Sequence, residues 1–260
     1  MEIANPGQWI ENTDPYVFKG RHELIGCGVT GKTAVIVVAG QSLNVNGVDS
    51  RYTPKQAGNR QMNIYDGKCY TTREPMLGTN GTGGTWMARF ADNLIEAGKF
   101  DRVILVPMAV GNTNVSQWAD TKNPPFLGRN IGIVGKRLKN ARLTCTAVFY
   151  GQGESDTRDD TTKDAYLASL QEVVSLFNQA MPGCPVLVAR ESYIYGKFGP
   201  QIQQAQAAAV NGTTIFAGED SDSISPAGRY DNTHLNSIGA EQRAQMAVNA
   251  LIAVPKLRLN

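Results

Sequence analysis

Five short apolar runs, spaced along most of the chain, constrain its fold more than any other feature of the sequence. Each run is rich in valine, isoleucine, leucine or phenylalanine without strict alternation, which is typical of parallel strands covered on both faces. Helical stretches separate the runs, and this order predicts a three-layer α/β/α sandwich around a five-stranded parallel sheet. The predicted strands are 34–39, 103–110, 144–150, 185–189 and 213–217.

A chain of 260 residues is long enough for one large α/β domain with a substantial core. No linker or internal repeat divides it, so we expect a single domain over residues 31–260, preceded by an extended N-terminal arm over residues 1–30. Residues 44–84 form a long polar insert, and we expect its glycine-rich tip, 78–84, to be flexible. An insert of this length within a compact domain is more often functional than idle.

Charge and hydropathy exclude several kinds of partner. The net charge of +2 is too small to indicate nucleic-acid binding, and no apolar run is long enough to insert into a membrane. The N-terminus has neither the basic nor the apolar segment of a signal peptide. Localisation and oligomeric state stay open, and an oligomer is compatible with the sequence.

The cysteines are widely scattered and none lies in a C-x-x-C pair, so we expect no structural zinc site. Cys145 falls within an apolar run, and we expect it to be a buried small hydrophobe. A disulfide between any two of the others is compatible with the sequence, which assigns none. The others are Cys27, Cys69 and Cys184.

Ser42 follows the first apolar run directly, where a parallel sheet presents its carboxyl edge to ligands. A serine acts as a nucleophile when a base removes its proton, and His234, three residues after Asp231, is the candidate base. The aspartate would orient the imidazole ring and stabilise its charge. The alternatives are a serine N-cap and an exposed loop histidine beside a capping carboxylate. We expect the other histidine, His22, to lie at the surface.

Two further predicted strand ends carry groups that can stabilise an oxyanion. Gly111 follows the second run and offers a backbone N–H, while Gln152 follows the third and offers a side-chain amide. A plain turn is the alternative for each. Four strand ends or loops together supply a nucleophile, two oxyanion donors and an acid–base pair, and this combination favours a hydrolase.

The same four segments resemble the motifs of the SGNH hydrolases, in particular the sialate O-acetylesterase-like carbohydrate esterases. Residues 39–42 resemble the block Gly-Gln-Ser, and residues 111–118 resemble Gly-Gly-Thr-Ser followed by an apolar residue and Trp. Residues 152–156 read Gln-Gly-Glu-Ser-Asp, as in the third and most specific block, and residues 231–234 fit Asp-x-x-His. The resemblance spans residues 34 to about 250 and implies the SGNH hydrolase fold, which is flavodoxin-like in winding.

The resemblance implies a role for each matching residue. The catalytic residues would be Ser42 as nucleophile, His234 as base and Asp231 as its partner. The oxyanion hole would consist of the backbone N–H groups of Ser42 and Gly111 with the side-chain amide of Gln152.

The residues expected near the substrate are Gln41, Asn112 and Glu154, the last as a structural acceptor rather than a catalyst. Asn112 departs from the family, which often has a second glycine there. A second departure is Tyr150-Gly151, which replaces a frequent Trp-His pair and is expected to reshape the acyl pocket. The sequence leaves two alternatives for three aromatic side chains, stacking on a sugar or burial in the core. They are Trp86, Trp118 and Tyr70.

The resemblance predicts a serine carbohydrate O-acetylesterase that works through an acyl-enzyme, needs no metal or organic cofactor, and acts on an acetylated glycan. A general short-chain or lipid-directed esterase of the same fold is one alternative. A non-catalytic carbohydrate-binding or virion module is another. The extended arm and the missing signal peptide are compatible with a virion-associated esterase, such as one in a phage tail, or with export by another route. An α/β-hydrolase fits worse, because G-x-S-x-G would need glycine at position 44, where this chain has asparagine.

Overall fold

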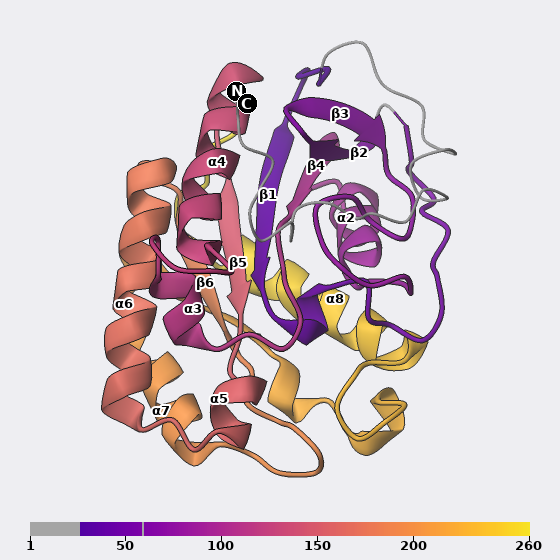
Figure 1. The fold of residues 1–260 in the computed structure, drawn as a ribbon. Helices are drawn as coiled ribbons and strands as arrows, with labels where there is room; N and C mark the ends of the chain where they lie inside the picture. Colours follow the sequence, from indigo (N-terminus) through magenta and orange to yellow (C-terminus); the bar gives the residue numbers. More distant parts are fainter. Residues whose placement is uncertain (1–26, 59) are drawn as a thin grey trace.

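The computed structural model describes residues 27–58 and 60–260 of the chain. The predicted surface residue His22, and the predicted N-terminal arm up to residue 26, lie outside the described residues. The described chain forms a central sheet with helices on both faces (Figure 1). No helix in this described part is long and apolar enough to cross a membrane.

All five predicted parallel strands are present, and they lie side by side in the order β4-β1-β5-β6-β7. Numbered by position along the chain, this order is second, first, third, fourth, fifth, which confirms the flavodoxin-like winding. The strands are β1 (Thr33–Gly40), β4 (Arg102–Pro107), β5 (Ala147–Gly151), β6 (Val186–Arg190) and β7 (Ile215–Asp220).

The predicted strand number is wrong, because the sheet has seven strands. The polar insert contributes a hairpin, β2 (Gln61–Tyr65) and β3 (Lys68–Thr71), and β2 pairs in parallel with β4. Asp66 and Gly67 both have positive φ at the turn, which suits a tight two-residue hairpin loop. An Asp-Gly pair is therefore the sequence signal that marks this hairpin.

The polar side chains of β2 hide it from a hydropathy pattern, although they are buried. Gln61 donates to Asp92 Oδ1 over 2.9 Å, and Asn63 accepts from the backbone N–H of Leu77 over 2.8 Å. Each amide thus has a partner inside the protein, so a buried strand tolerates it. Distant partners of this kind cannot be read from the local sequence.

The helices form one layer on each face of the sheet. On one face α3 (Val115–Ala119), α4 (Leu127–Asn140), α6 (Lys163–Ala180) and α7 (Pro200–Ala209) pack on one another, and on the other face α2 (Met87–Glu96) packs against α8 (Ser237–Ile252) (Figure 1). The short helix α5 (Glu154–Arg158) lies at the carboxyl edge of the sheet (Figure 1). Short 3-10 turns complete the list: η1 (Ser42–Asn44), η2 (Ser221–Ser223) and η3 (Pro226–Gly228).

Strand β1 lies at the centre of the sheet and is buried along its whole length. Val35 and Val37 face the core under α4 and α6, whereas Ile36 and Val38 face the core under α2 and α8. A strand with apolar side chains on both faces is what a run without alternation predicts. The central position of β1 fixes where the chain leaves the sheet at Gly40.

The glycine-rich tip of the insert, residues 78–84, is tied to the segment after Ser42. The N–H of Asn46 donates to Asn80 O over 2.9 Å, and Val48 and Gly84 exchange two backbone hydrogen bonds of 2.9 Å each. Thr79 is fully buried and donates its hydroxyl to Ala109 O. The expectation that this tip is flexible is therefore wrong, because its backbone groups are paired with their neighbours.

Two disulfides join the four cysteines, Cys27 to Cys69 and Cys145 to Cys184. Cys145 is buried, as expected, but the sequence did not indicate its disulfide with Cys184, 39 residues away, which reaches the same end of the β5–β6 pair. Pairing across the sheet is a tertiary contact that cysteine spacing does not reveal.

Removing the second disulfide tests this assignment. Replacing Cys145 and Cys184 together by alanine should lower the free energy of unfolding by about 3–4 kcal/mol, because closing a loop of this size restricts the unfolded chain. Urea unfolding measures the loss, with the unreduced natural chain as reference. Titration of the unreduced, denatured natural chain should find no free thiol, and the detection of free thiols would contradict the pairing.

Candidate active site

The carboxyl ends of β1, β4 and β5 meet directly beneath Ser42. The N–H of Gln41 donates to Gly151 O and the N–H of Val110 donates to Gly40 O, each over 2.9 Å. Gly40 has φ of +123°, and a Cβ there would lie 1.7 Å from Gly151 O. Only glycine fits such a close approach of two backbones, so the sequence Gly-Gln-Ser fixes where the serine emerges.

Ser42 begins the 3-10 turn η1 and is half-buried. Its hydroxyl donates to Glu154 Oε1 over 3.2 Å. The Cβ of Ser42 lies 3.9 Å from where a Cβ on Gly111 would be, so the backbone of Gly111 borders the serine. Among the described residues, no acceptor takes the backbone N–H of Ser42.

Asp231 and His234 form a close pair in the loop before α8. The Asp231 Oδ2 lies 2.6 Å from His234 Nδ1, and Oδ1 accepts the backbone N–H groups of Thr233 and His234 over 3.0 and 2.6 Å. One carboxylate therefore closes the turn and orients the ring. Burial alone would raise the pKa of Asp231, but the hydrogen bonds from the His234 ring and backbone outweigh it and lower the pKa.

Buried Arg229 holds this loop from below, a role that sequence reasoning missed. Its guanidinium donates to the backbone oxygens of Ser221, over 2.6 Å, and of Thr233. It also lies over the ring of Tyr193, 4.5 Å from the centroid. The only local signal is an arginine two residues before the Asp-x-x-His motif.

Tyr230 connects the histidine loop to the serine loop. Its ring stacks on His234 with 5.9 Å between centroids, and its hydroxyl donates to Gly47 O over 3.3 Å. The structure thus brings Ser42 and His234 to one edge of the sheet. Within the described part of the chain, no hydrogen bond joins their side chains, and the Ser42 hydroxyl is directed to Glu154.

Gln41 and Gln152 are buried, and both brace the site rather than face a ligand. The Gln152 amide donates to Gln41 Oε1, Thr113 O and Asp156 Oδ2, over 2.9, 2.9 and 2.6 Å. Its N–H groups therefore have acceptors within the protein, and the structure offers none for an oxyanion. Gln41 Oε1 also accepts the N–H of Ser155 over 3.1 Å, so the predicted substrate contact is replaced by an anchor for α5.

Asn112 is exposed with φ of +58°, a left-handed conformation that glycine and asparagine adopt most readily. This explains how asparagine replaces the glycine that the family often has there. Its Oδ1 accepts from Arg158 over 2.6 Å.

The N–H of Gly111 donates to Asn80 Oδ1 over 3.1 Å, which brings Asn80 to the site from the insert. Sequence reasoning missed Asn80, because nothing in the insert pairs it with Gly111.

Glu154 is fully buried and does not reach solvent, so it contacts the Ser42 hydroxyl rather than a bound sugar. Burial, followed by the nearby carboxyl of Glu191, raises its pKa well above the ordinary value. Arg243 from α8 and Glu191 from the loop after β6 lie beside it and were not identified from the sequence. The signal for Arg243 was available, since it interrupts an alanine-rich helix face.

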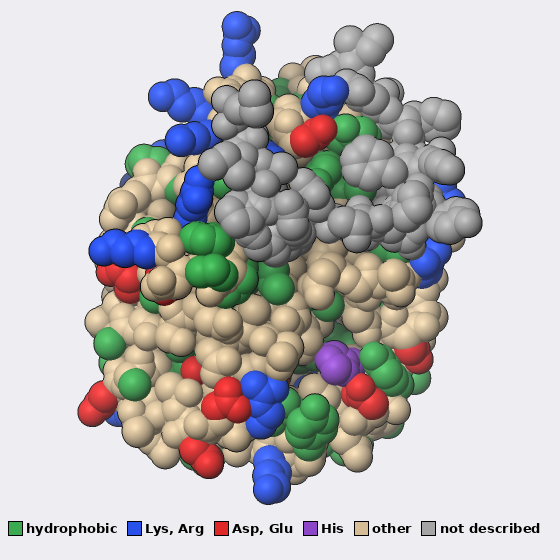
Figure 2. Space-filling view, in the orientation of Figure 1, with side chains coloured by type: hydrophobic (Ala, Val, Ile, Leu, Met, Phe, Trp, Pro, Cys, Tyr) green, Lys and Arg blue, Asp and Glu red, His purple; other side chains and the backbone are tan. Residues whose placement is uncertain are grey.

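Some aromatic side chains lie in the core and others lie at the surface. Trp86, Trp118 and Tyr70 are buried, so none is available to stack on a sugar. Tyr195 and Tyr230 are exposed, and the backbone N–H of Tyr195 donates to Thr233 Oγ1 beside the histidine. Figure 2 shows the histidine side chain at the surface with exposed hydrophobic side chains beside it, whereas lysine and arginine side chains gather near the opposite end of this face.

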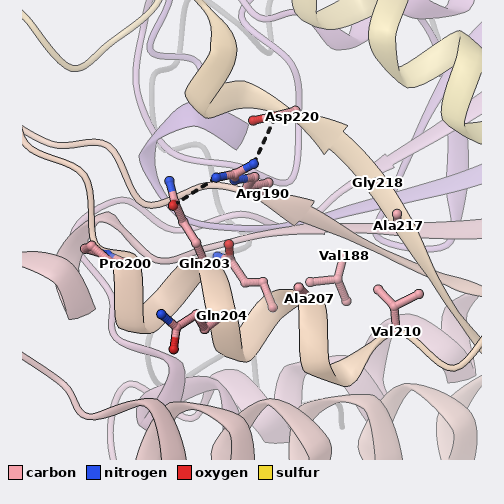
Figure 3. Close-up of a pocket in the computed structure, with 11 residues that line it drawn as sticks. Val188, Arg190, Pro200, Gln203, Gln204, Ala207, Val210, Ala217, Gly218 and Asp220 are labelled. Atoms are coloured by element: carbon pink, nitrogen blue, oxygen red, sulfur yellow. Dashed lines mark hydrogen bonds and ion pairs between the residues drawn. The ribbon is translucent and has the colours of Figure 1, made fainter.

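A cavity of about 480 Å³ lies elsewhere, between α7 and strands β6 and β7 (Figure 3). Arg190 and Gln203 meet at its polar end over 3.0 Å. None of the predicted site residues lines it.

Across the described residues, no group of three or more His, Cys, Asp or Glu is placed to hold a metal ion.

The structure defines an α/β/α protein with a mostly parallel central sheet. The sequence matches the family model described as "Carbohydrate esterase, sialic acid-specific acetylesterase" over residues 32–253. The chain therefore belongs to this family and is an ester-hydrolysing enzyme. No curated protein sequence matches it.

Solved structures share the fold at low sequence identity. A protein from Arabidopsis thaliana aligns with a TM-score of 0.68 at 17% identity, covering 86% of this chain and 99% of that one. NanS aligns with a TM-score of 0.57 at 13% identity, covering 86% of this chain and 98% of that one. A carbohydrate esterase of family 3 from Talaromyces cellulolyticus aligns with a TM-score of 0.53 at 12% identity, covering 84% and 96%. These likenesses establish the fold.

The lowered pKa of Asp231 predicts how stability depends on pH. Because the folded pKa lies below the ordinary value of 3.8, the unfolded chain takes up this proton first on acidification. The stabilisation is therefore full above the ordinary pKa and is lost as the pH falls through the folded pKa. The natural chain should exceed Asp231→Asn in unfolding free energy at neutral pH, with a gap that narrows toward about pH 3. Urea unfolding across this range measures the gap, and a constant gap would contradict the assignment.

Proposed function

We propose that the protein is a serine carbohydrate O-acetylesterase that removes acetyl groups from a glycan through an acyl-enzyme. The observation that carries this proposal is the 2.6 Å Asp231–His234 pair on the sheet edge where Ser42 emerges. An imidazole held by a carboxylate beside a serine is the arrangement that activates a hydroxyl for acyl transfer. Membership of a carbohydrate esterase family supports the choice of substrate.

In the proposed reaction, the Ser42 hydroxyl turns from Glu154 to His234, which removes its proton as the oxygen attacks the acetyl carbonyl. The tetrahedral intermediate collapses, the C–O bond to the sugar breaks, and protonated His234 returns the proton to the leaving sugar oxygen. A water molecule, deprotonated by His234, then attacks the acetyl-serine. The bond between the acetyl carbon and Ser42 Oγ breaks, acetate leaves, and His234 returns the proton to the Ser42 oxygen. Asp231 keeps the imidazole in the required tautomer and stabilises its positive charge.

The oxyanion in this proposal is held by backbone N–H groups. Ser42 N–H has no acceptor among the described residues, and Gly111 N–H lies next to the serine. Asn80 Oδ1 accepts the Gly111 N–H in the ligand-free site, so the substrate oxygen would share or replace this acceptor. Gln152, assigned to the hole from the sequence, acts in this proposal by holding Gln41 and α5 in place.

The glycan in this proposal lies over the exposed aromatic side chains of Tyr195 and Tyr230. Both are next to the histidine loop, and tyrosine rings present flat apolar faces with a polar end, which suits a sugar ring. The proposed chemistry needs no metal or organic cofactor, since the chain supplies base, nucleophile and donors. Attachment to a virion and assembly into an oligomer stay predictions.

Removal of the nucleophile or the base tests the mechanism. Ser42→Ala and His234→Ala should each lower kcat/KM for acetate release by about 10⁴-fold or more, because the remaining groups cannot replace either function. Asp231→Asn should lower it by about 10³- to 10⁴-fold through loss of the correct tautomer. Acetate release from acetylated xylan, sialic acid or bacterial polysaccharide provides the assay.

Ser169→Ala on α6, outside the site, is the matched control and should keep the activity of the natural chain. Mass spectrometry after rapid quenching should find an acetyl group on Ser42. Full activity in Ser42→Ala would overturn the mechanism. Glycan binding by the natural chain without any acetate release would instead favour the non-catalytic module.

Acyl-chain length separates an acetylesterase from a lipid-directed esterase. Backbone hydrogen bonds join the short segment 42–47 to the tip of the insert beside Ser42, and in this proposal they restrict the acyl pocket to short chains. We therefore expect kcat/KM on p-nitrophenyl esters to be highest for acetate and to fall with each added pair of carbons. Maximal activity on chains much longer than acetate would favour the alternative.

A further inference from the structure

A cluster of buried charged side chains lies beneath the nucleophile and has no part in the proposed reaction. Arg243 is fully buried, and its Nη2 lies 2.7 Å from Glu191 Oε2 and 2.6 Å from Glu219 Oε1. Glu154 completes the cluster, and its Oε1 accepts the Ser42 hydroxyl over 3.2 Å. The cluster therefore reaches the reacting oxygen through one carboxyl group.

The charges of this cluster do not balance if every carboxyl group is ionised. Three carboxylates against one guanidinium would leave two negative charges unbalanced in a site closed to water, which is strongly unfavourable. Burial and the neighbouring Glu191 both raise the pKa of Glu154, which is the one carboxyl group of these three that forms no ion pair with Arg243. Glu154 is thus the carboxyl group of the cluster whose burial and missing ion pair most favour the protonated form.

The hydrogen bonds place that proton on one oxygen of Glu154. Glu191 lies near enough to raise the pKa of Glu154, and a proton held between the two carboxyl groups would relieve their repulsion. Glu154 Oε2 is buried and accepts from no N–H or O–H group in the described part of the chain, as expected for the oxygen that carries the proton. The other oxygen, Oε1, is then a neutral carbonyl oxygen that accepts the Ser42 hydroxyl.

We propose that Glu154 is a positioning residue that orients the Ser42 hydroxyl as a neutral carboxylic acid, and that Glu191 keeps it neutral by accepting its proton. This inference rests on the proposed function of Ser42. The neutral Oε1 holds the hydroxyl without competing with His234 for the proton. It also keeps negative charge away from the oxygen that becomes an alkoxide and from the adjoining oxyanion.

Gly151, which has no side chain, leaves the space that the side chains of this cluster occupy. A Cβ on Gly151 would lie 2.5 Å from Asn44 Nδ2, 2.7 Å from Glu191 Oε2 and 2.8 Å from Arg243 Nη2. Asn44, in the same 3-10 turn as Ser42, donates to Gly151 O over 2.8 Å and accepts from Arg243 over 2.9 Å. The serine turn and the charged cluster are therefore built as one unit.

The neutral state of Glu154 should limit activity at high pH. Ionisation would place a carboxylate 3.2 Å from the nucleophile and slow formation of the alkoxide and the oxyanion. The titratable and charged groups around it come from every neighbouring element: Tyr150 on β5, Asp156 on its own helix, Tyr166 on α6, Glu191 after β6, Glu219 on β7 and Arg243 on α8. The two tyrosines are buried, and burial raises their pKa values well above the ordinary value.

The test compares two replacements of Glu154 in the full chain. Glu154→Ala removes the acceptor, and kcat should fall about 100-fold because the nucleophile is no longer oriented. Glu154→Gln keeps a neutral carbonyl that accepts from Ser42 and an N–H that donates to Glu191, so it should recover most of that loss. Because glutamine cannot ionise, the fall in kcat/KM at alkaline pH should disappear in Glu154→Gln. The exposed Glu172→Gln on α6 is the control for loss of one carboxylate.

A change at Glu191 should act in the opposite direction. Glu191→Gln removes the negative charge that holds the proton on Glu154 and leaves Arg243 nearby, so Glu154 ionises at lower pH. The alkaline fall in kcat/KM should therefore move to lower pH, which loss of structural support alone would not produce. Circular dichroism confirms that each variant is folded before it is assayed.

Two outcomes would overturn the inference. Activity of Glu154→Gln as low as that of Glu154→Ala would show that the ionisable carboxyl itself is required, and an unchanged alkaline limb in Glu154→Gln would show that Glu154 does not govern it. Labelling with a fluorophosphonate separates this failure from failure of the proposed function. If Ser42 is labelled and Ser42→Ala is inactive, only the role of Glu154 is wrong, whereas full activity in Ser42→Ala removes the basis of both proposals.

Discussion

The buried ion pairs of Arg243 are the interaction on which the rest of the site depends. One guanidinium from α8 contacts Glu191 after β6 and Glu219 on β7, and it also donates to Leu43 O and Asn44 Oδ1 in the serine turn. Breaking a buried pair by removing one partner typically costs about 3–5 kcal/mol, because the remaining charge stays in a medium of low polarity. The last helix is therefore locked onto the strand ends that carry the chemistry.

Buried hydrogen bonds extend this arrangement across the carboxyl edge. Gln41 joins the serine turn to α5 through Gln152 and the N–H of Ser155, and Arg229 holds the histidine loop to Ser221. Each group is buried, so losing one partner would leave another without a hydrogen bond. Ser42 and His234 are thus held at one edge of the sheet by separate sets of buried contacts, and Tyr230 connects their two loops.

The sequence predicted the strands that are buried through apolar side chains, and it missed those that are buried through polar ones. The five apolar strands were predictable, because strands covered on both faces need apolar residues at every position, whereas their order was implied by the family resemblance. The hairpin β2–β3 was not predictable, because Gln61 and Asn63 are polar and have partners on α2 and beyond the strand. The two disulfides were unassigned for the same reason, since their cysteines meet only after the sheet is assembled.

The sequence by itself determined the family, the sheet that presents Ser42 at its carboxyl edge, and the Asp231–His234 spacing, since all of these follow from local patterns and the chain order of the strands. The tertiary structure decided which polar groups face each other. It placed the Gln152 amide on internal acceptors, brought Asn80 from the insert to Gly111, and buried Glu154 against Glu191 and Arg243. The physical reason is that a hydrogen bond or a charge pair depends on distance in space, and residues far apart in the chain meet only when the layers pack.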